Sequence, residues 1–137
     1  ALLRSAECAG DTGVVLPRHR DVHVTPTVTK AAAGAVEHLP FAIVGGLPAA
    51  LQELRRLGVW VVGLDAEGPI SLWALPAAAS GPIALVLGAE GSGLSRLVRQ
   101  RCDEIVSIPL SGSLGSLNVA VAGALACFEV ARVRQRT

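Results

Sequence analysis

Short apolar runs alternate along this chain with longer amphipathic stretches, and this alternation constrains the fold more than any other feature of the sequence. The run at 59–64 (VWVVGL) is almost continuously apolar, as expected for a strand that is buried on both faces. Further strands are predicted at 13–16, Phe41–Val44, Ile83–Leu87 and 105–108. Strands separated by helices predict an α/β fold with a parallel sheet.

Helices are predicted before, between and after these strands, at Leu2–Ala9, 26–33, 48–57, 95–101 and 117–134. Gly10 and Gly58 directly follow two of them, in the position where glycine commonly ends a helix. Residues 65–80 are rich in Pro, Gly and Ala and predict an irregular connection. We expect Leu72 and Trp73 to hold this connection against the body of the domain.

Size and charge narrow the classes of function. A length of 137 residues fits one domain. A net charge of +1 is too small to hold nucleic acid by charge alone, so any RNA contact must be local, shared with a partner subunit or supplied by another segment. The apolar runs fall short of the ~20 residues that a membrane span needs.

The three cysteines, Cys8, Cys102 and Cys127, are an odd number and show no Cys-x-x-Cys spacing. This pattern argues against a zinc site and against a disulfide framework, and it favours a reducing, cytoplasmic location. We therefore expect no metal.

Two glycine-rich turns follow predicted strands and lead into helices: 88–95 (GAEGSGLS) and 109–118 (PLSGSLGSLN). In open α/β sheets, ligands bind beyond the carboxyl ends of the strands. Leu94 stands where a phosphate-binding loop needs its lysine, and Arg96 stands where the dinucleotide fingerprint needs its third glycine. The turns are better suited to a flat, weakly charged ligand that is read by main-chain groups, such as adenine with a methionine tail.

The segment LVLGAEGSGLS, followed by IVSIPLSGSLGSLNVAVAGALACFEV, resembles the second and third motifs of the knotted SPOUT-class (SpoU/TrmH-type) RNA 2′-O-ribose methyltransferases. The opening ALLRSAECAG resembles the end of the first motif of that family, Asn-x-Gly-Ala-x-x-Arg, and places the Asn-x-Gly upstream of Ala1. The resemblance runs the full length of the chain. It implies a parallel-sheet α/β/α sandwich with a deep C-terminal trefoil knot, in which residues 1–137 form a catalytic domain. It also implies that this domain lacks its first strand and an upstream RNA-binding domain.

The same resemblance assigns the site. Backbone groups near six residues are expected to hold S-adenosylmethionine: Leu64, Gly88, Ile108, Leu110, Gly112 and Leu117. Four polar residues are expected to serve catalysis: Arg4, Glu90, Ser116 and Asn118. Arg4 matches the arginine that the family is proposed to use for removing the hydroxyl proton. Because arginine is normally protonated, orienting the substrate or stabilising a nearby phosphate is physically easier.

Each of these polar residues also has a purely structural interpretation. Arg4 could be a surface cation on the first helix, and Glu90, Ser116 and Asn118 could cap the helices that follow them. Found together inside matching motifs, Arg4, Glu90 and Asn118 favour functional roles, whereas Ser116 stays open between the two interpretations.

The activity implied by the resemblance is transfer of a methyl group from S-adenosylmethionine to a ribose 2′-hydroxyl of RNA, with rRNA favoured over tRNA. The resemblance also implies a homodimer, with the first and last helices at its interface. Two other hypotheses remain open at this stage. One is a degenerate knotted module that binds RNA or cofactor without turnover, and the other is a nicotinamide-dependent oxidoreductase.

Overall fold

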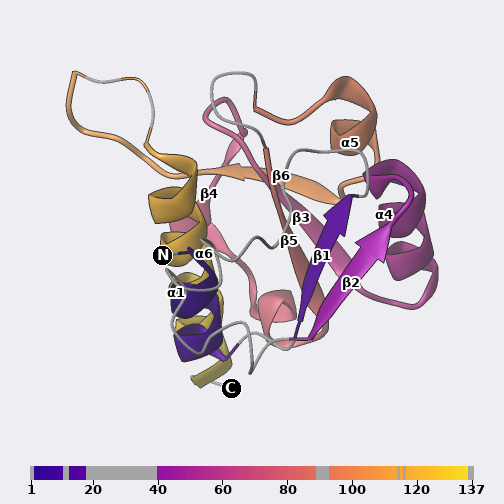
Figure 1. Cartoon of the computed structure of the whole chain (residues 1–137). Helices are drawn as coiled ribbons and strands as arrows, with labels where there is room; N and C mark the ends of the chain where they lie inside the picture. The colour runs from indigo at the N-terminus through magenta and orange to yellow at the C-terminus, as the bar shows by residue number, and fades with distance from the viewer. Residues whose placement is uncertain are drawn as a thin grey trace.

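The computed structural model describes residues 2–10, 13–17, 40–88, 93–113, 115 and 117–135, and these residues form an α/β fold (Figure 1). The helix predicted at 26–33 lies outside the described residues. None of the described helices combines the length and apolar character that crossing a membrane requires.

The main sheet has four parallel strands in the order β4-β6-β3-β5. Their bounds are Trp60–Leu64 for β3, Ile70–Ser71 for β4, Ile83–Leu87 for β5 and Glu104–Ser107 for β6. The strands predicted at 59–64, at Ile83–Leu87 and at 105–108 are therefore confirmed to within a residue. Strand β3 is central, and its last residue, Leu64, is in register with Leu87 of β5 and Val106 of β6.

A second pair of parallel strands consists of β1 (Val14–Pro17) and β2 (Phe41–Val44). Both were predicted from their apolar runs. Within the part of the chain that the structure describes, these two strands bond only to each other and form a separate two-stranded sheet. Figure 1 shows them side by side near helix α4 (Leu47–Arg56).

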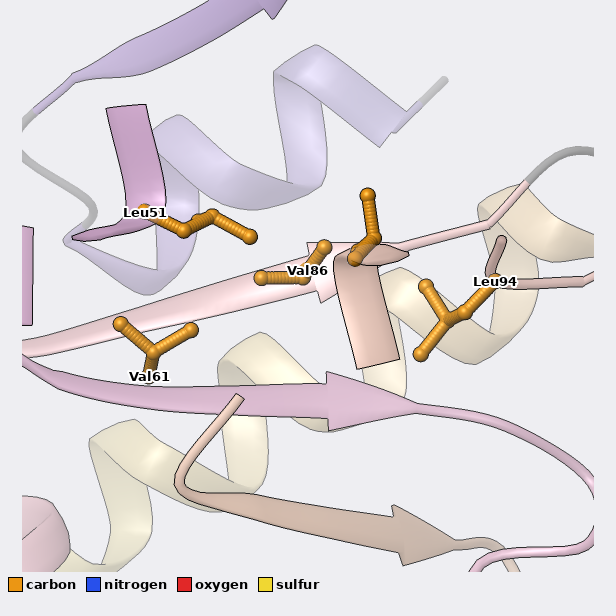
Figure 2. Close-up of a cluster of buried hydrophobic side chains, with 5 residues drawn as sticks. Leu51, Val61, Val86 and Leu94 are labelled. Atoms are coloured by element: carbon orange, nitrogen blue, oxygen red, sulfur yellow. The ribbon is translucent and has the colours of Figure 1, made fainter. Parts of the chain in front are cut away.

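Helices cover both faces of the main sheet, and the alternating side chains of β3 show this directly. Val61 packs with Leu51 of α4 (Leu47–Arg56), Val86 and Leu94 in one buried cluster (Figure 2). Val98 of α5 (Arg96–Gln100) completes that cluster.

The neighbouring residue of β3, Val62, faces the opposite side of the sheet. There it belongs to a second buried cluster with Leu72, Val106 and Ala126 of α6 (Val119–Gln135). Helix α1 (Leu2–Ala9) packs against α6 on this side (Figure 1). Because successive strand residues point to opposite faces, one strand supplies both cores, and the predicted α/β/α layering is confirmed.

The connection at 65–80 is more ordered than the sequence predicted. It contains β4 and two short 3₁₀ helices, Leu72–Ala74 and Ala77–Ser80. Leu72 is fully buried, as predicted, but the prediction for Trp73 is wrong, because Trp73 is 50% exposed. The Ser71 hydroxyl accepts the Trp73 N–H and begins a 3₁₀ helix there. With three residues per turn, adjacent side chains point in different directions, so the two residues cannot both face the core.

Candidate active site

Three of the predicted cofactor-binding residues lie at one edge of the sheet. Leu64 ends β3, Gly88 follows β5 directly, and Ile108 follows β6 directly. Because β5, β3 and β6 are neighbouring parallel strands, their carboxyl ends meet at the same edge. The side chains of Leu64 and Ile108 belong to the apolar cluster around Leu72, which gives this edge an apolar wall.

The glycine turn after β5 closes on itself through a backbone contact. A Cβ atom on Gly88 would lie 2.3 Å from the carbonyl carbon of Gly93 and 2.6 Å from the Leu94 nitrogen. Gly93 has a φ of +68°, in the left-handed region that favours glycine. The two ends of the turn can therefore meet only because both positions lack a side chain, and main-chain groups dominate this part of the edge.

Asp65 is the residue at this edge that sequence reasoning missed. Its Oδ1 accepts the Glu67 N–H at 2.9 Å, and its Oδ2 lies 2.8 Å from Nη1 of Arg99. The Asp65 N–H donates to the Val106 carbonyl oxygen at 3.0 Å. An acidic residue directly after a buried parallel strand was the available signal, but Arg99 and Val106, its partners besides Glu67, lie about 30 to 40 residues away.

The environment of Asp65 favours its charged form. The pKa of Asp65 is lowered, chiefly by the hydrogen bond from the Glu67 N–H. Partial burial opposes this shift, whereas the charge of Arg99 and the hydrogen bond from Leu94 reinforce it. The Asp65 side chain is 15% exposed, so the carboxylate is largely shielded from water while it is bound to Glu67 and Arg99.

The second glycine-rich turn leads from β6 to α6. Leu110 and Leu117 are partly exposed, and a Cβ atom on Gly112 would meet no protein atom within 4 Å. Figure 1 shows this segment projecting away from the sheet at the start of α6. The contacts of these three residues with a cofactor stay predictions, as does the knot.

Asn118 caps α6. Its Oδ1 accepts the Ala120 N–H at 2.8 Å and the Val121 N–H at 3.3 Å. The structural interpretation of this residue is thus confirmed, and the catalytic one stays a prediction. Glu90 and Ser116 lie outside the described residues.

Arg4 is exposed on α1, and the packing of that helix places its first turn near the end of β5. A Cβ atom on Gly123 of α6 would lie 2.8 Å from the Cδ1 atoms of both Leu2 and Leu87. The first turn of α1 therefore lies beside the last residue of β5, next to Gly88. This arrangement brings the first turn of α1, which carries Arg4, to the neighbourhood of the strand ends. The catalytic role of Arg4 stays a prediction.

The described part of the site combines main-chain groups, an apolar wall, one ion-paired carboxylate and one cation. Among the described residues, no three His, Cys, Asp or Glu side chains are grouped as a metal site requires. Such a site can hold a flat ligand through main-chain hydrogen bonds and apolar contact. Arg4 is exposed and could therefore contact an anionic or hydroxylic substrate.

Comparison with known proteins identifies a family that shares this sequence and fold. The family model described as "SpoU rRNA Methylase family" matches residues 1–128. The 23S rRNA (guanosine-2′-O-)-methyltransferase RlmB of Ralstonia nicotianae is 47% identical over 134 residues, which cover 98% of this chain and 53% of that protein. The chain spans about half the length of the curated relatives that it matches.

Solved structures agree with this match. The SpoU methyltransferase AviRb of Streptomyces viridochromogenes, in complex with the cofactor AdoMet, superposes with a TM-score of 0.88 at 30% identity, covering 99% of this chain and 55% of that one. The AdoMet-bound rRNA methyltransferase of Sinorhizobium meliloti superposes with a TM-score of 0.84 at 26% identity, covering 96% of this chain and 49% of that one.

Proposed function

The chain belongs to the SpoU rRNA methylase family, and from this premise we propose that it transfers a methyl group from S-adenosylmethionine to a ribose 2′-hydroxyl of RNA. The observation that carries the proposal is the meeting of three strand ends, at Leu64, Gly88 and Ile108, beside a glycine turn that a single Cβ atom would open. Ribosomal RNA is the proposed substrate class, because the name of the Ralstonia relative specifies guanosine in 23S rRNA.

The residues at this edge fit the cofactor. Adenine is flat and uncharged, and main-chain groups near Leu64 and Gly88 can read it without a cationic side chain. The apolar wall at Leu64, Leu72 and Ile108 suits a ring or a methionine tail. Leu110, Gly112 and Leu117 are proposed to complete the binding site from the second turn.

When bound, S-adenosylmethionine supplies an electrophilic methyl group on a sulfonium centre. The contribution of the protein is then mainly in-line positioning of the ribose oxygen. We assign this role to Arg4, whose guanidinium can donate hydrogen bonds to the 2′-hydroxyl or to a flanking phosphate. Glu90 and Asn118 are proposed to orient Arg4 and the ribose, and Ser116 to support the same turn.

A homodimer is proposed as the working form. Val121, Leu125 and Phe128 are 50%, 38% and 49% exposed on α6, at a spacing that places them on one face. A contiguous apolar helix face on the surface is typical of a protein interface. Because α1 already packs on α6, a partner seated there would bring its residues close to Arg4.

Affinity for RNA and cellular location are proposals as well. A net charge of +1 leaves substrate affinity to a separate RNA-binding domain, for which an upstream segment is proposed. The three free cysteines fit a reducing compartment such as the cytoplasm.

Two measurements on the intact protein test this function. Calorimetric titration should detect binding of S-adenosylmethionine, and tritium from labelled cofactor should enter ribosomal RNA rather than transfer RNA. Cofactor binding without transfer to any RNA would instead support a module that binds without turnover. Absence of cofactor binding would refute the proposal.

A further inference from the structure

The carboxylate of Asp65 joins three elements that meet at the candidate site. It follows Leu64 at the end of β3, lies against Gly93 at the end of the glycine turn, and pairs with Arg99 on α5. Through its own N–H it also bonds to Val106 of β6. No catalytic step proposed above uses this residue.

The contact with the glycine turn is close. A Cβ atom on Gly93 would lie 3.0 Å from Oδ2 of Asp65, so the carboxylate lies directly against the backbone of that residue. Gly93 is also the residue whose carbonyl group meets Gly88. Asp65 therefore contacts one side of the turn, and Gly88 contacts the other.

We propose that Asp65 is a positioning residue for the cofactor, acting by fixing the glycine turn at Gly93–Leu94 relative to the end of β3. The inference rests on the proposed function, because it concerns the same cofactor site. A carboxylate suits this role, since it can accept two backbone N–H groups and a guanidinium at once, and such charge-assisted bonds are stronger than neutral ones. Without these bonds, the turn would sample positions in which the main-chain groups near Gly88 and Leu64 no longer face one ligand.

The chain offers a matched control at the opposite end of the same strand. Asp103 accepts the Val61 N–H at 2.8 Å through Oδ2 and pairs with Arg55 at 2.9 Å through Oδ1. It thus has the same kinds of partner as Asp65, a backbone N–H and an arginine. Val61 lies near the amino end of β3, away from the glycine turn. If replacing Asp65 affected cofactor binding only by weakening the fold, replacing Asp103 should therefore have the same effect.

The experiment compares Asp65→Ala with Asp103→Ala in the intact protein. For Asp65→Ala, the Kd for S-adenosylmethionine measured by calorimetry should rise about tenfold, and kcat at saturating cofactor should stay within about threefold. Asp103→Ala should leave that Kd within about twofold. In the protein without cofactor, hydrogen exchange of the Leu94 amide should be at least tenfold faster in Asp65→Ala and unchanged in Asp103→Ala.

Equal increases in Kd for the two variants would overturn the proposal, as would a fall in kcat with an unchanged KM for the cofactor. If Asp65→Ala does not fold, the isosteric pair Asp65→Asn and Asp103→Asn decides by the same comparison, with an expected increase in Kd of about threefold for Asp65→Asn alone. Failure of the wild-type protein to bind the cofactor would instead refute the proposed function. Wild-type binding with unaltered binding by the Asp65 variants would refute only this inference.

Discussion

Replacing Gly88 with alanine tests whether closure of the glycine turn builds the candidate site. The added Cβ atom would lie 2.3 Å and 2.5 Å from the carbonyl carbon and oxygen of Gly93. Ordinary contacts of such atoms begin at about 3.4 Å, so the backbone must move by roughly 1 Å. The obstacle is backbone rather than a flexible side chain, and overpacking of this kind costs about 3 kcal/mol.

The loss should be visible in two assays. In urea unfolding, Gly88→Ala should lower the free energy of unfolding by about 3 kcal/mol, a large share of the ~5–15 kcal/mol that a domain has. Calorimetry should show loss of binding of S-adenosylmethionine. Gly45→Ala is the matched control, because its Cβ atom would meet nothing within 4 Å and should change stability by less than about 0.5 kcal/mol. A destabilisation by Gly88→Ala of under about 1 kcal/mol, with unchanged cofactor affinity, would refute the reasoning.

Three further predictions concern titration and charge. Burial raises the pKa of Cys102 to about 11, so at pH 8 only roughly 0.1% of the Cys102 thiol is ionised to thiolate. A thiol reagent should therefore modify the exposed Cys8 well before Cys102. The pKa of Asp65 is lowered in the folded state, so its contribution to stability is complete above about pH 5 and is lost as the pH falls below about 4. The difference in unfolding free energy between wild type and Asp65→Asn should therefore shrink at low pH. A difference that widens at low pH would contradict this. Arg132→Met should lower the melting temperature more than Arg56→Met, because Glu129, the partner of Arg132, is buried, whereas Glu53, the partner of Arg56, is exposed. Equal decreases in melting temperature for the two variants would contradict this prediction.

The strands and helices were predictable because each carries its own local signal. The apolar run in β3 indicated burial on both faces, and Gly10 and Gly58 marked helix ends. The placement of the two glycine-rich turns at the carboxyl ends of strands needed only local pattern and a rule of topology. The selection of Leu64, Gly88 and Ile108 as site residues came instead from the resemblance to the family.

The connection at 65–80 and the role of Asp65 were not predictable in this way. A strand of two residues, such as β4, leaves no periodic signal, and two adjacent apolar residues, Leu72 and Trp73, do not reveal which one faces the core. Two residues that contact Asp65, Gly93 and Arg99, lie about 30 residues away along the chain and meet it only because β3 and β5 are neighbours. Such contacts depend on tertiary structure, and composition carries no trace of them.

The most direct test of the central claim is where the methyl group goes. The intact protein would be incubated with ribosomal RNA and tritium-labelled S-adenosylmethionine, and the RNA would then be hydrolysed in alkali. A methylated ribose oxygen cannot take part in alkaline cleavage, so the label should appear in alkali-resistant dinucleotides. Arg4→Ala should abolish this transfer while leaving cofactor affinity within a few-fold. Label released in mononucleotides, or near-normal transfer by Arg4→Ala, would contradict the account.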